Sequence, residues 1–298
     1  MRVFLTGGTG FIGSAVVADL LGAGHTVLGL ARSAASAKAL EAAGATPHRG
    51  SLEDVESLRA GAARSDGVIH TAFGTTDLAA FVENSRIERA ALEAIGDTLA
   101  GSDRPLVVTA GFAFLTPGSV ATEDDRGPVP ANPVGRAAEA LATSLAEEAG
   151  VRTSVVRLPC VHGTGDRFTV PRYIAVARRT GVSAYIGDGL NRWSAVHHTD
   201  AARVYRLALE RAAPGARYHA VAEEGVPFRR VAEVIGRRLG LPVLSRTPEE
   251  ADAHFGIDAY FAGADVPASS TLTRRRLGWR PLGPSLLADL DRDGYYTA

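Results

Sequence analysis

The sequence predicts an α/β fold, a doubly wound parallel sheet followed by a smaller C-terminal lobe. An apolar run at residues 3–5 leads directly into a glycine-rich turn and then into a segment with apolar residues at helical spacing. Short apolar runs and amphipathic segments alternate from there to about residue 158, which is typical of a parallel sheet with helices on both faces. We therefore expect one unit over residues 1–160 and a smaller mixed α/β lobe over residues 161–298, contiguous with the first.

The N-terminal turn has the glycine spacing of a dinucleotide-binding site. Gly7, Gly10 and Gly13 lie three residues apart between the first strand and the first helix. Glycine can adopt positive φ and has no Cβ, so the backbone can approach a pyrophosphate. The helix N-terminus offers free N–H groups to the phosphates, and the last glycine lets helix and strand pack closely. This order predicts a Rossmann-type coenzyme site; the alternative is a glycine-rich turn that binds nothing.

The remaining elements of the first unit follow from apolar spacing and capping residues. Ser51 or Asp54 can cap a helix that begins shortly after residue 50. Residues 77–99 have one recurring apolar face, and Gly150 ends a helix over residues 134–149. Further strands are expected near residues 26–30, 46–49, 66–73, 105–110 and 151–158, with a helix at 34–43.

The second lobe is predicted from shorter signals. Ligands in this architecture bind at the carboxyl ends of the strands, so we expect the lobe to close over that edge, beside a loop rich in proline and glycine at residues 112–131. Helices are expected near residues 171–180, 200–212, 227–239, 271–277 and 285–290, and strands near 183–186, 194–198 and 217–221.

Composition excludes several classes of function. The 32 basic and 33 acidic residues give a net charge of −1, so there is no general attraction to nucleic acid or to an anionic membrane. No run of 18 apolar residues occurs, and the sequence begins with the first strand, which leaves no signal peptide. The single cysteine, Cys160, excludes an intrachain disulfide, and the histidines lack metal-ligand spacing. We expect a cytoplasmic protein that acts on a small molecule and binds no metal.

The end of the second strand indicates which coenzyme binds. An acidic residue at this place binds the ribose 2′-hydroxyl of NAD, whereas an arginine accommodates the 2′-phosphate of NADP. Residues 30–33 contain no acid, and Arg32 stands beside Ser33. This favours NADP over NAD, the alternative being a surface arginine. Lys38, the only lysine, is interpreted as a solvated helix residue.

Four segments occur in a familiar order: TGGTGFIG at 6–13, DGVIHTA at 66–72, LVVT at 106–109 and VRLPCVHG at 156–163. With residues 191–202, they resemble the extended short-chain dehydrogenase/reductase superfamily, the NAD-dependent epimerase/dehydratase group, over nearly the whole chain. The resemblance implies a homodimer through the helices at 77–99 and 134–149, unless their apolar residues face the sheet. It also implies coenzyme contacts at Gly7, Gly10, Phe11, Ile12 and Gly13 (phosphates), Ser51 and Leu52 (adenine), Thr71, Ala72 and Phe73 (nicotinamide ribose), and Pro159, Val161 and His162 (nicotinamide).

The chain departs from the usual chemistry of that superfamily, which uses a Ser or Thr, a Tyr, and a Lys four residues after the Tyr. None of the seven tyrosines has a lysine at that spacing, because Lys38 precedes them all. Val134 and Ala138 stand at the Tyr and Lys places, and Gly111 at the Ser place. We interpret the chain as an atypical member that keeps the coenzyme site and replaces the acid/base residues.

Three residues are candidates for that replacement. His162 stands after the sixth predicted strand, and histidine is the side chain type best suited to acid/base catalysis near neutral pH; the alternative is a histidine that only hydrogen-bonds its loop. Thr109 could polarise a carbonyl or satisfy the end of its strand. Arg136 stays protonated and could supply the electrostatic role of the lysine. The expected substrate-pocket residues, whose aromatic members could equally be core residues, are Phe112, Tyr185, Trp193 and His198.

These residues predict an NADP-dependent oxidoreductase that acts on a small organic carbonyl, enone, imine or alcohol. A non-tyrosine group or water would supply the proton. Two alternatives stay open: a non-redox epimerase, dehydratase or cyclase on the same scaffold, and a coenzyme-sensing protein without catalysis. A redox enzyme converts its coenzyme stoichiometrically, a non-redox enzyme forms product without net coenzyme change, and a sensor binds without turnover.

Overall fold

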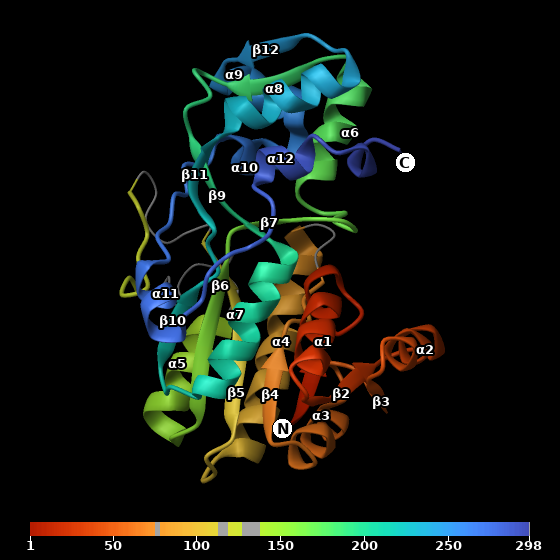
Figure 1. Ribbon diagram of the computed structural model, residues 1–298, viewed down its shortest axis with the longest axis vertical. Coiled ribbons are helices and arrows are strands. Elements are labelled where there is room, and N and C mark those ends of the chain that lie inside the picture. The colour runs from red at the N-terminus through yellow and green to blue at the C-terminus, as the bar shows by residue number, and fades with distance from the viewer. Residues whose placement is uncertain (75–77, 113–118, 127–137, 298) are drawn as a thin grey trace.

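A parallel sheet forms the centre of the molecule (Figure 1). The computed structural model describes residues 1–74, 78–112, 119–126 and 138–297. Within them the sheet has seven strands in the order β10-β6-β5-β4-β1-β2-β3, and each neighbouring pair is parallel. The strands are β1 (Arg2–Thr6), β2 (Thr26–Ala31), β3 (Thr46–Arg49), β4 (Gly67–His70), β5 (Pro105–Gly111), β6 (Arg152–Leu158) and β10 (Ala216–His219).

Helices cover both faces of the sheet because the side chains of each strand alternate between two cores. Val3 and Leu5 of β1 pack in the core that α1 and α7 cover, whereas Phe4 packs in the core beneath α3, α4 and α5. Apolar residues in the second half of α4, from Ala91 to Leu99, and the buried apolar residues of α5 lie in that second core, which favours the sheet-facing alternative for these parts. In the first half of α4, Val82 is 52% exposed. The helices are α1 (Phe11–Gly22), α2 (Ala34–Ala42), α3 (Val55–Ala63), α4 (Leu78–Leu99), α5 (Ala138–Ala149) and α7 (His198–Arg211).

The strand order reverses beside β1, and this reversal positions the site. From β1 the chain proceeds to β2 and β3 on one side, and then crosses to β4 on the other side. The helices that follow β1 and β4 lie on opposite faces of the sheet. A crevice at such a switch point is where open α/β sheets bind their ligands.

The second lobe lies above the carboxyl ends of the strands (Figure 1). It has its own core around Tyr173, Trp193, Phe228 and Phe255. Its elements are β7 (Cys160–His162), α6 (Val170–Thr180), β8 (Ser183–Ile186), β9 (Arg192–His197), β11 (Glu223–Pro227), α8 (Phe228–Leu239), β12 (Val243–Arg246), α9 (Pro248–Phe255), α10 (Ala259–Gly263) and α12 (Leu286–Leu290). The short helix α11 (Thr271–Leu277) contacts α7 and β10.

The expected division at residue 160 needs correction. The chain returns to the first unit after β9: α7 packs against α1, and β10 extends the main sheet beside β6. The predicted strand near residues 217–221 therefore belongs to the sheet and not to the second lobe. No helix of the described ranges is long and apolar enough to cross a membrane.

A fully buried arginine joins three segments at the β6 side of the sheet. The Arg157 guanidinium donates from Nε to Glu139 Oε2 (3.0 Å), and Arg217 Nε donates to Glu139 Oε1 (3.0 Å). Arg157 Nη1 donates to Nε2 of His219 (3.0 Å), whose Nδ1 donates to Ser269 O (2.7 Å). Burial lowers the pKa of His219 to about 4, so this imidazole is neutral at pH 7, as the hydrogen bonds require.

Replacing Glu139 by Gln tests the importance of this cluster for stability. The variant leaves a buried guanidinium without its anionic partner, and such a loss costs about 3 kcal/mol. We expect that decrease in the free energy of unfolding by urea denaturation. Glu233→Gln, which breaks exposed pairs on α8, is the control and should change little. A Glu139→Gln protein as stable as the wild type would show that the cluster contributes nothing.

Candidate functional site

The glycine turn after β1 is closed by its own backbone. The Gly10 amide donates to Gly7 O (2.9 Å), and Gly7 adopts φ +78°. A Cβ on Gly7 would lie 2.7 Å from the backbone nitrogen of Ala72, and a Cβ on Gly13 would lie 2.0 Å from Gly7 O. Both positions therefore require glycine, and the turn lies directly against the segment that follows β4.

The N-terminus of α1 opens onto this turn. Gly10 occupies the N-cap position and has no side chain to accept the first amides, and the first helical turn carries no acidic residue. Amides of a first helical turn have no acceptor within the helix. The N–H groups of Phe11 and Ile12 thus suit an anionic oxygen, and the lack of Cβ atoms at the turn leaves room for its approach. These residues fit the diphosphate of a dinucleotide.

The other predicted coenzyme residues lie at the same edge of the sheet, after β2, β3 and β4. Thr71 Oγ1 donates to Thr6 O (2.8 Å), which ties the end of β4 to the end of β1. Ser51 and Leu52 are half-buried after β3, and Phe73 packs edge-on against Phe81. On the β6 side, Pro159 is half-buried and Val161 is buried.

Arg32 leaves the end of β2 with an exposed side chain. None of the described acidic residues forms an ion pair with it, whereas arginines such as Arg157 and Arg192 have carboxylate partners. Ser33 beside it caps α2, because its hydroxyl accepts the Ser36 amide (3.1 Å). A cation without a partner next to an exposed hydroxyl suits a phosphate group.

The residues predicted to be catalytic do not come together at this edge in the described part of the structure. The Thr109 hydroxyl donates to His70 O (2.8 Å) and lies 2.7 Å from the Tyr205 hydroxyl, all in the interior. This supports the alternative that Thr109 satisfies the end of its strand. Arg136 lies outside the described residues, as does Val134. Ala138 is fully buried at the start of α5.

His162 is also fully buried, and its Nδ1 lies 3.0 Å from Asp289 Oδ2. Its Nε2 has no hydrogen-bond partner among the described residues. A substrate could reach this nitrogen only after a rearrangement. The geometry favours the second interpretation of His162, a histidine that holds its loop.

Three expected pocket residues lie elsewhere. Phe112 is a core residue, packed edge-on against His219 beside Ala121, Val221 and Ala268. Trp193 lies in the core of the second lobe and donates from Nε1 to Phe261 O (2.9 Å). Tyr185 lies on β8, which pairs with β12 at the end of the lobe farthest from the sheet (Figure 1). Aromatic size alone did not distinguish a core position from a pocket position.

His198 does reach the coenzyme turn. Its ring stacks on Phe11 with centroids 5.0 Å apart and an interplanar angle of 23°. Burial, followed by repulsion from His197, lowers the pKa of His198 to about 4, so the ring is neutral at pH 7. His197 packs beside His198, and His162 packs edge-on against His197.

Two clusters of polar side chains at this edge were not predicted from the sequence. His70 accepts or donates at Nδ1 with Thr6 Oγ1 (2.9 Å), and its Nε2 lies 3.3 Å from Glu88 Oε1, with both side chains fully buried. Asp289 and Tyr295 approach from the end of the chain. No sequence signal could have found these contacts, because only the fold brings together Thr6 with His70 and His162 with Asp289, which lie 64 and 127 positions apart. No group of three potential metal ligands occurs among the residues that the structure describes.

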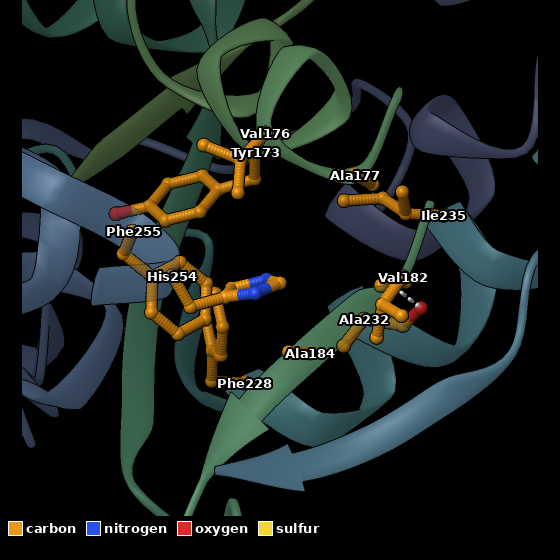
Figure 2. Close-up of a pocket in the computed structure, with 11 residues that line it drawn as sticks. Tyr173, Val176, Ala177, Val182, Ala184, Phe228, Ala232, Ile235, His254 and Phe255 are labelled. Carbon is orange, nitrogen blue, oxygen red and sulfur yellow. Dashed lines mark hydrogen bonds between the residues drawn. The ribbon is translucent and has the colours of Figure 1, made fainter. Parts of the chain in front are cut away.

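A small cavity in the second lobe is too small for a substrate. It measures about 10 Å³, enough for one water molecule. Figure 2 shows the His254 ring pointing into it among apolar side chains that include Tyr173 and Ile235. Its Nε2 has no partner among the described residues, so we interpret the cavity as a hydration site.

Replacing Gly13 by Ala tests the close packing of the turn. The new Cβ would meet the Gly7 carbonyl, so helix and strand must separate, and we expect a loss of about 2 kcal/mol in unfolding free energy. Gly22→Ala in the same helix is the matched control, because a Cβ there meets nothing within 4 Å. It should leave stability unchanged or slightly higher. Equal stability of the two variants would contradict the packing.

Comparisons with known proteins agree with this geometry. The model of the NAD dependent epimerase/dehydratase family matches residues 3–221. An uncharacterized protein of Schizosaccharomyces pombe is 48% identical over 298 residues, which cover 99% of this chain and 100% of that protein. A decarboxylating sterol-4-alpha-carboxylate 3-dehydrogenase of Dictyostelium discoideum is 31% identical and covers 77% of this chain and 74% of its own length.

Two further matches extend over almost the whole chain. A 4-hydroxy-2-methyl-3-oxo-4-farnesyl-3,4-dihydroquinoline-1-oxide ketoreductase of Stigmatella aurantiaca is 28% identical over 94% of this chain and 92% of its own. The crystal structure of the dTDP-glucose 4,6-dehydratase DesIV of Streptomyces venezuelae superposes with a TM-score of 0.78 at 20% identity, covering 99% of this chain and 97% of that one. The latter shows that the folds are alike. The chain belongs to the NAD dependent epimerase/dehydratase family, an enzyme family of the extended short-chain dehydrogenase/reductase type.

Proposed function

We propose that this chain is an NADP-dependent oxidoreductase that acts on a small organic carbonyl, enone, imine or alcohol. The observation that carries the proposal is the closed glycine turn at the switch point, with an uncapped helix N-terminus. Directly after the neighbouring strand β2 stands Arg32, which has no ion-pair partner among the described residues. Two relatives whose names denote redox chemistry at a ketone or alcohol, the sterol dehydrogenase and the ketoreductase, support this reaction class.

Each part of the coenzyme has residues that would hold it. The amides of Phe11 and Ile12 would bind the diphosphate, and Arg32 with Ser33 would bind the 2′-phosphate. When bound, the nicotinamide supplies the hydride acceptor or donor. The remaining contacts that we propose are Ser51 and Leu52 for the adenine, Thr71, Ala72 and Phe73 for the nicotinamide ribose, and Pro159 and Val161 beside the nicotinamide.

Water is our first candidate for the proton donor. The chain has no tyrosine followed by lysine at the fourth position. The hydroxyl of Thr109 is already hydrogen-bonded, and His162 has no exposed surface. Reduction of an enone or an imine makes a smaller demand for a proton at oxygen than reduction of a ketone. The arrangement therefore favours enones and imines among the four substrate classes, with Arg136 proposed to stabilise developing negative charge.

The second candidate is a non-redox epimerase or dehydratase with a bound coenzyme, which the matching family model favours. The two candidates are separated by incubating the protein with NADPH and a panel of ketones, enones and imines. Stoichiometric loss of reduced-nicotinamide absorbance supports the oxidoreductase. Product without net change in the coenzyme supports the second candidate, and binding without turnover across the panel contradicts both.

Arg32→Ala tests the coenzyme preference. Charge-assisted hydrogen bonds to a phosphate contribute about 1.5–3 kcal/mol, so we expect the dissociation constant for NADPH to rise by roughly tenfold or more. The constant for NADH should barely change, because NADH lacks the 2′-phosphate. Lys38→Ala, which removes an exposed cation from the adjoining helix, is the control. An equal loss of affinity for both coenzymes would remove the assignment of NADP.

A further inference from the structure

The loop between β7 and α6 lies on the first residue of the phosphate-binding helix. A Cβ on Gly165 would lie 3.9 Å from Phe11 Cδ2, and a Cβ on Gly163 would lie 2.2 Å from His198 Cδ2. His198 in turn stacks on Phe11. Loop residues 163–166, the imidazole and the phenyl ring therefore form one continuous layer beside the N-terminus of α1.

The end of the chain holds this loop from the other side. The Tyr295 hydroxyl accepts the Gly163 amide (2.8 Å) and donates to Asp289 Oδ2 (3.0 Å). His162 Nδ1 donates to the same carboxylate oxygen (3.0 Å). Arg292 Nη1 approaches the other carboxylate oxygen at 3.4 Å. The Asp289 carboxylate, 2% exposed, thus holds the last residue of β7 directly and the first residue of the loop through the Tyr295 hydroxyl.

The protonation states suit this arrangement. Burial by itself would raise the pKa of Asp289. The hydrogen bonds from His162 and Tyr295, together with the nearby imidazoles, outweigh burial and lower this pKa, so Asp289 stays an anion. Burial raises the pKa of Tyr295, which keeps its hydroxyl protonated as a donor. Hydrogen bonds to a charged acceptor are about twice as strong as those between neutral groups.

The C-terminal segment, residues 282–295, carries these side chains and is itself fixed to both lobes. The carboxylate of Asp200 at the start of α7 accepts the amides of Leu282 and Gly283 (2.7–3.0 Å). Glu223 Oε2 on β11 accepts the Leu286 amide (2.6 Å). The segment is therefore anchored on the sheet unit before it reaches the second lobe, and it can hold the loop in a defined place.

We propose that Asp289 and Tyr295 are positioning residues: they hold loop residues 163–166 over the diphosphate-binding turn and so act on coenzyme binding without touching the coenzyme. The inference rests on the proposed function. It adds that two residues near the C-terminus contribute to the affinity for the coenzyme. Gly163 and Gly165 both adopt positive φ, and because glycine lacks a Cβ, the untethered backbone at these two positions would be free to adopt other conformations. Ordering it before the coenzyme arrives reduces the entropy lost on binding.

Asp289→Asn and Tyr295→Phe test the proposal through direct binding. We expect calorimetric dissociation constants for NADPH, NADH and ADP-ribose to rise by a common factor of about ten, since the three ligands share the diphosphate. Replacing Arg32 by Ala, by contrast, should raise the dissociation constant for NADPH alone. In the coenzyme-free variants, amide hydrogen exchange should become faster at residues 163–170 and stay unchanged in the sheet.

Two neighbouring residues provide matched controls. Asp291→Asn removes an acid of the same segment that forms a partly exposed pair with Arg237, and Tyr296→Phe removes a hydroxyl that has no partner among the described residues. Both should leave affinity and exchange unchanged.

Wild-type affinity and exchange in Tyr295→Phe, which removes one oxygen atom and should fold normally, would overturn the inference. Effects equal to those of the controls would also overturn it. A wild-type protein that binds none of the three ligands would instead contradict the proposed function, so the two failures are distinguishable.

Discussion

The contact between Gly13 and the carbonyl of Gly7 is the constraint on which the rest of this structure depends. It lets α1 begin directly against the end of β1, at the point where the strand order reverses. Because α1 is seated there, α7 can pack along it and bring His198 back onto Phe11. The loop from the second lobe then rests on the same place. The backbone contact between these two glycines thereby positions both the glycine turn and the groups that pack on it, namely the His198 ring and the loop after β7.

Buried carboxylates attach segments that lie outside the main sheet. Glu139 links α5 to β6 and β10 through two arginines, Asp200 holds the start of the C-terminal segment, and Asp289 fixes the loop after β7. A buried anion is costly unless all its acceptor sites are used. Each of these groups is therefore stable in only one arrangement of the segments around it, which gives the two lobes a defined relation.

The sequence predicted the elements that have strong local signals. Strand 183–186 and helix 271–277 have the predicted bounds, and the glycine turn lies where its spacing placed it. Within the described residues, five strands and α-helices were not predicted, namely β7, β11, β12, α9 and α10, nor were two 3₁₀ helices at Gly256–Asp258 and Asp293–Tyr295. Segments of three to eight residues contain too few positions for a hydrophobic period. Asp54, one of two predicted caps, is the residue that caps α3.

The site was predictable only in part, for a related reason. The proposed coenzyme residues follow strand ends, which a sequence reveals, so their common edge could be inferred. Whether an aromatic ring such as Phe112 or Trp193 faces a core or a cleft depends on packing between lobes, which no local pattern encodes. The partner of His162 lies 127 positions away, and the carboxylate that holds it has no signature in its own neighbourhood.

The most direct test of the central claim is a crystal structure of the protein grown with saturating NADPH. We predict electron density for the diphosphate against the amides of Phe11 and Ile12, with the 2′-phosphate beside the Arg32 guanidinium. A diphosphate bound at another edge, a 2′-phosphate directed away from Arg32, or crystals without bound coenzyme would contradict it.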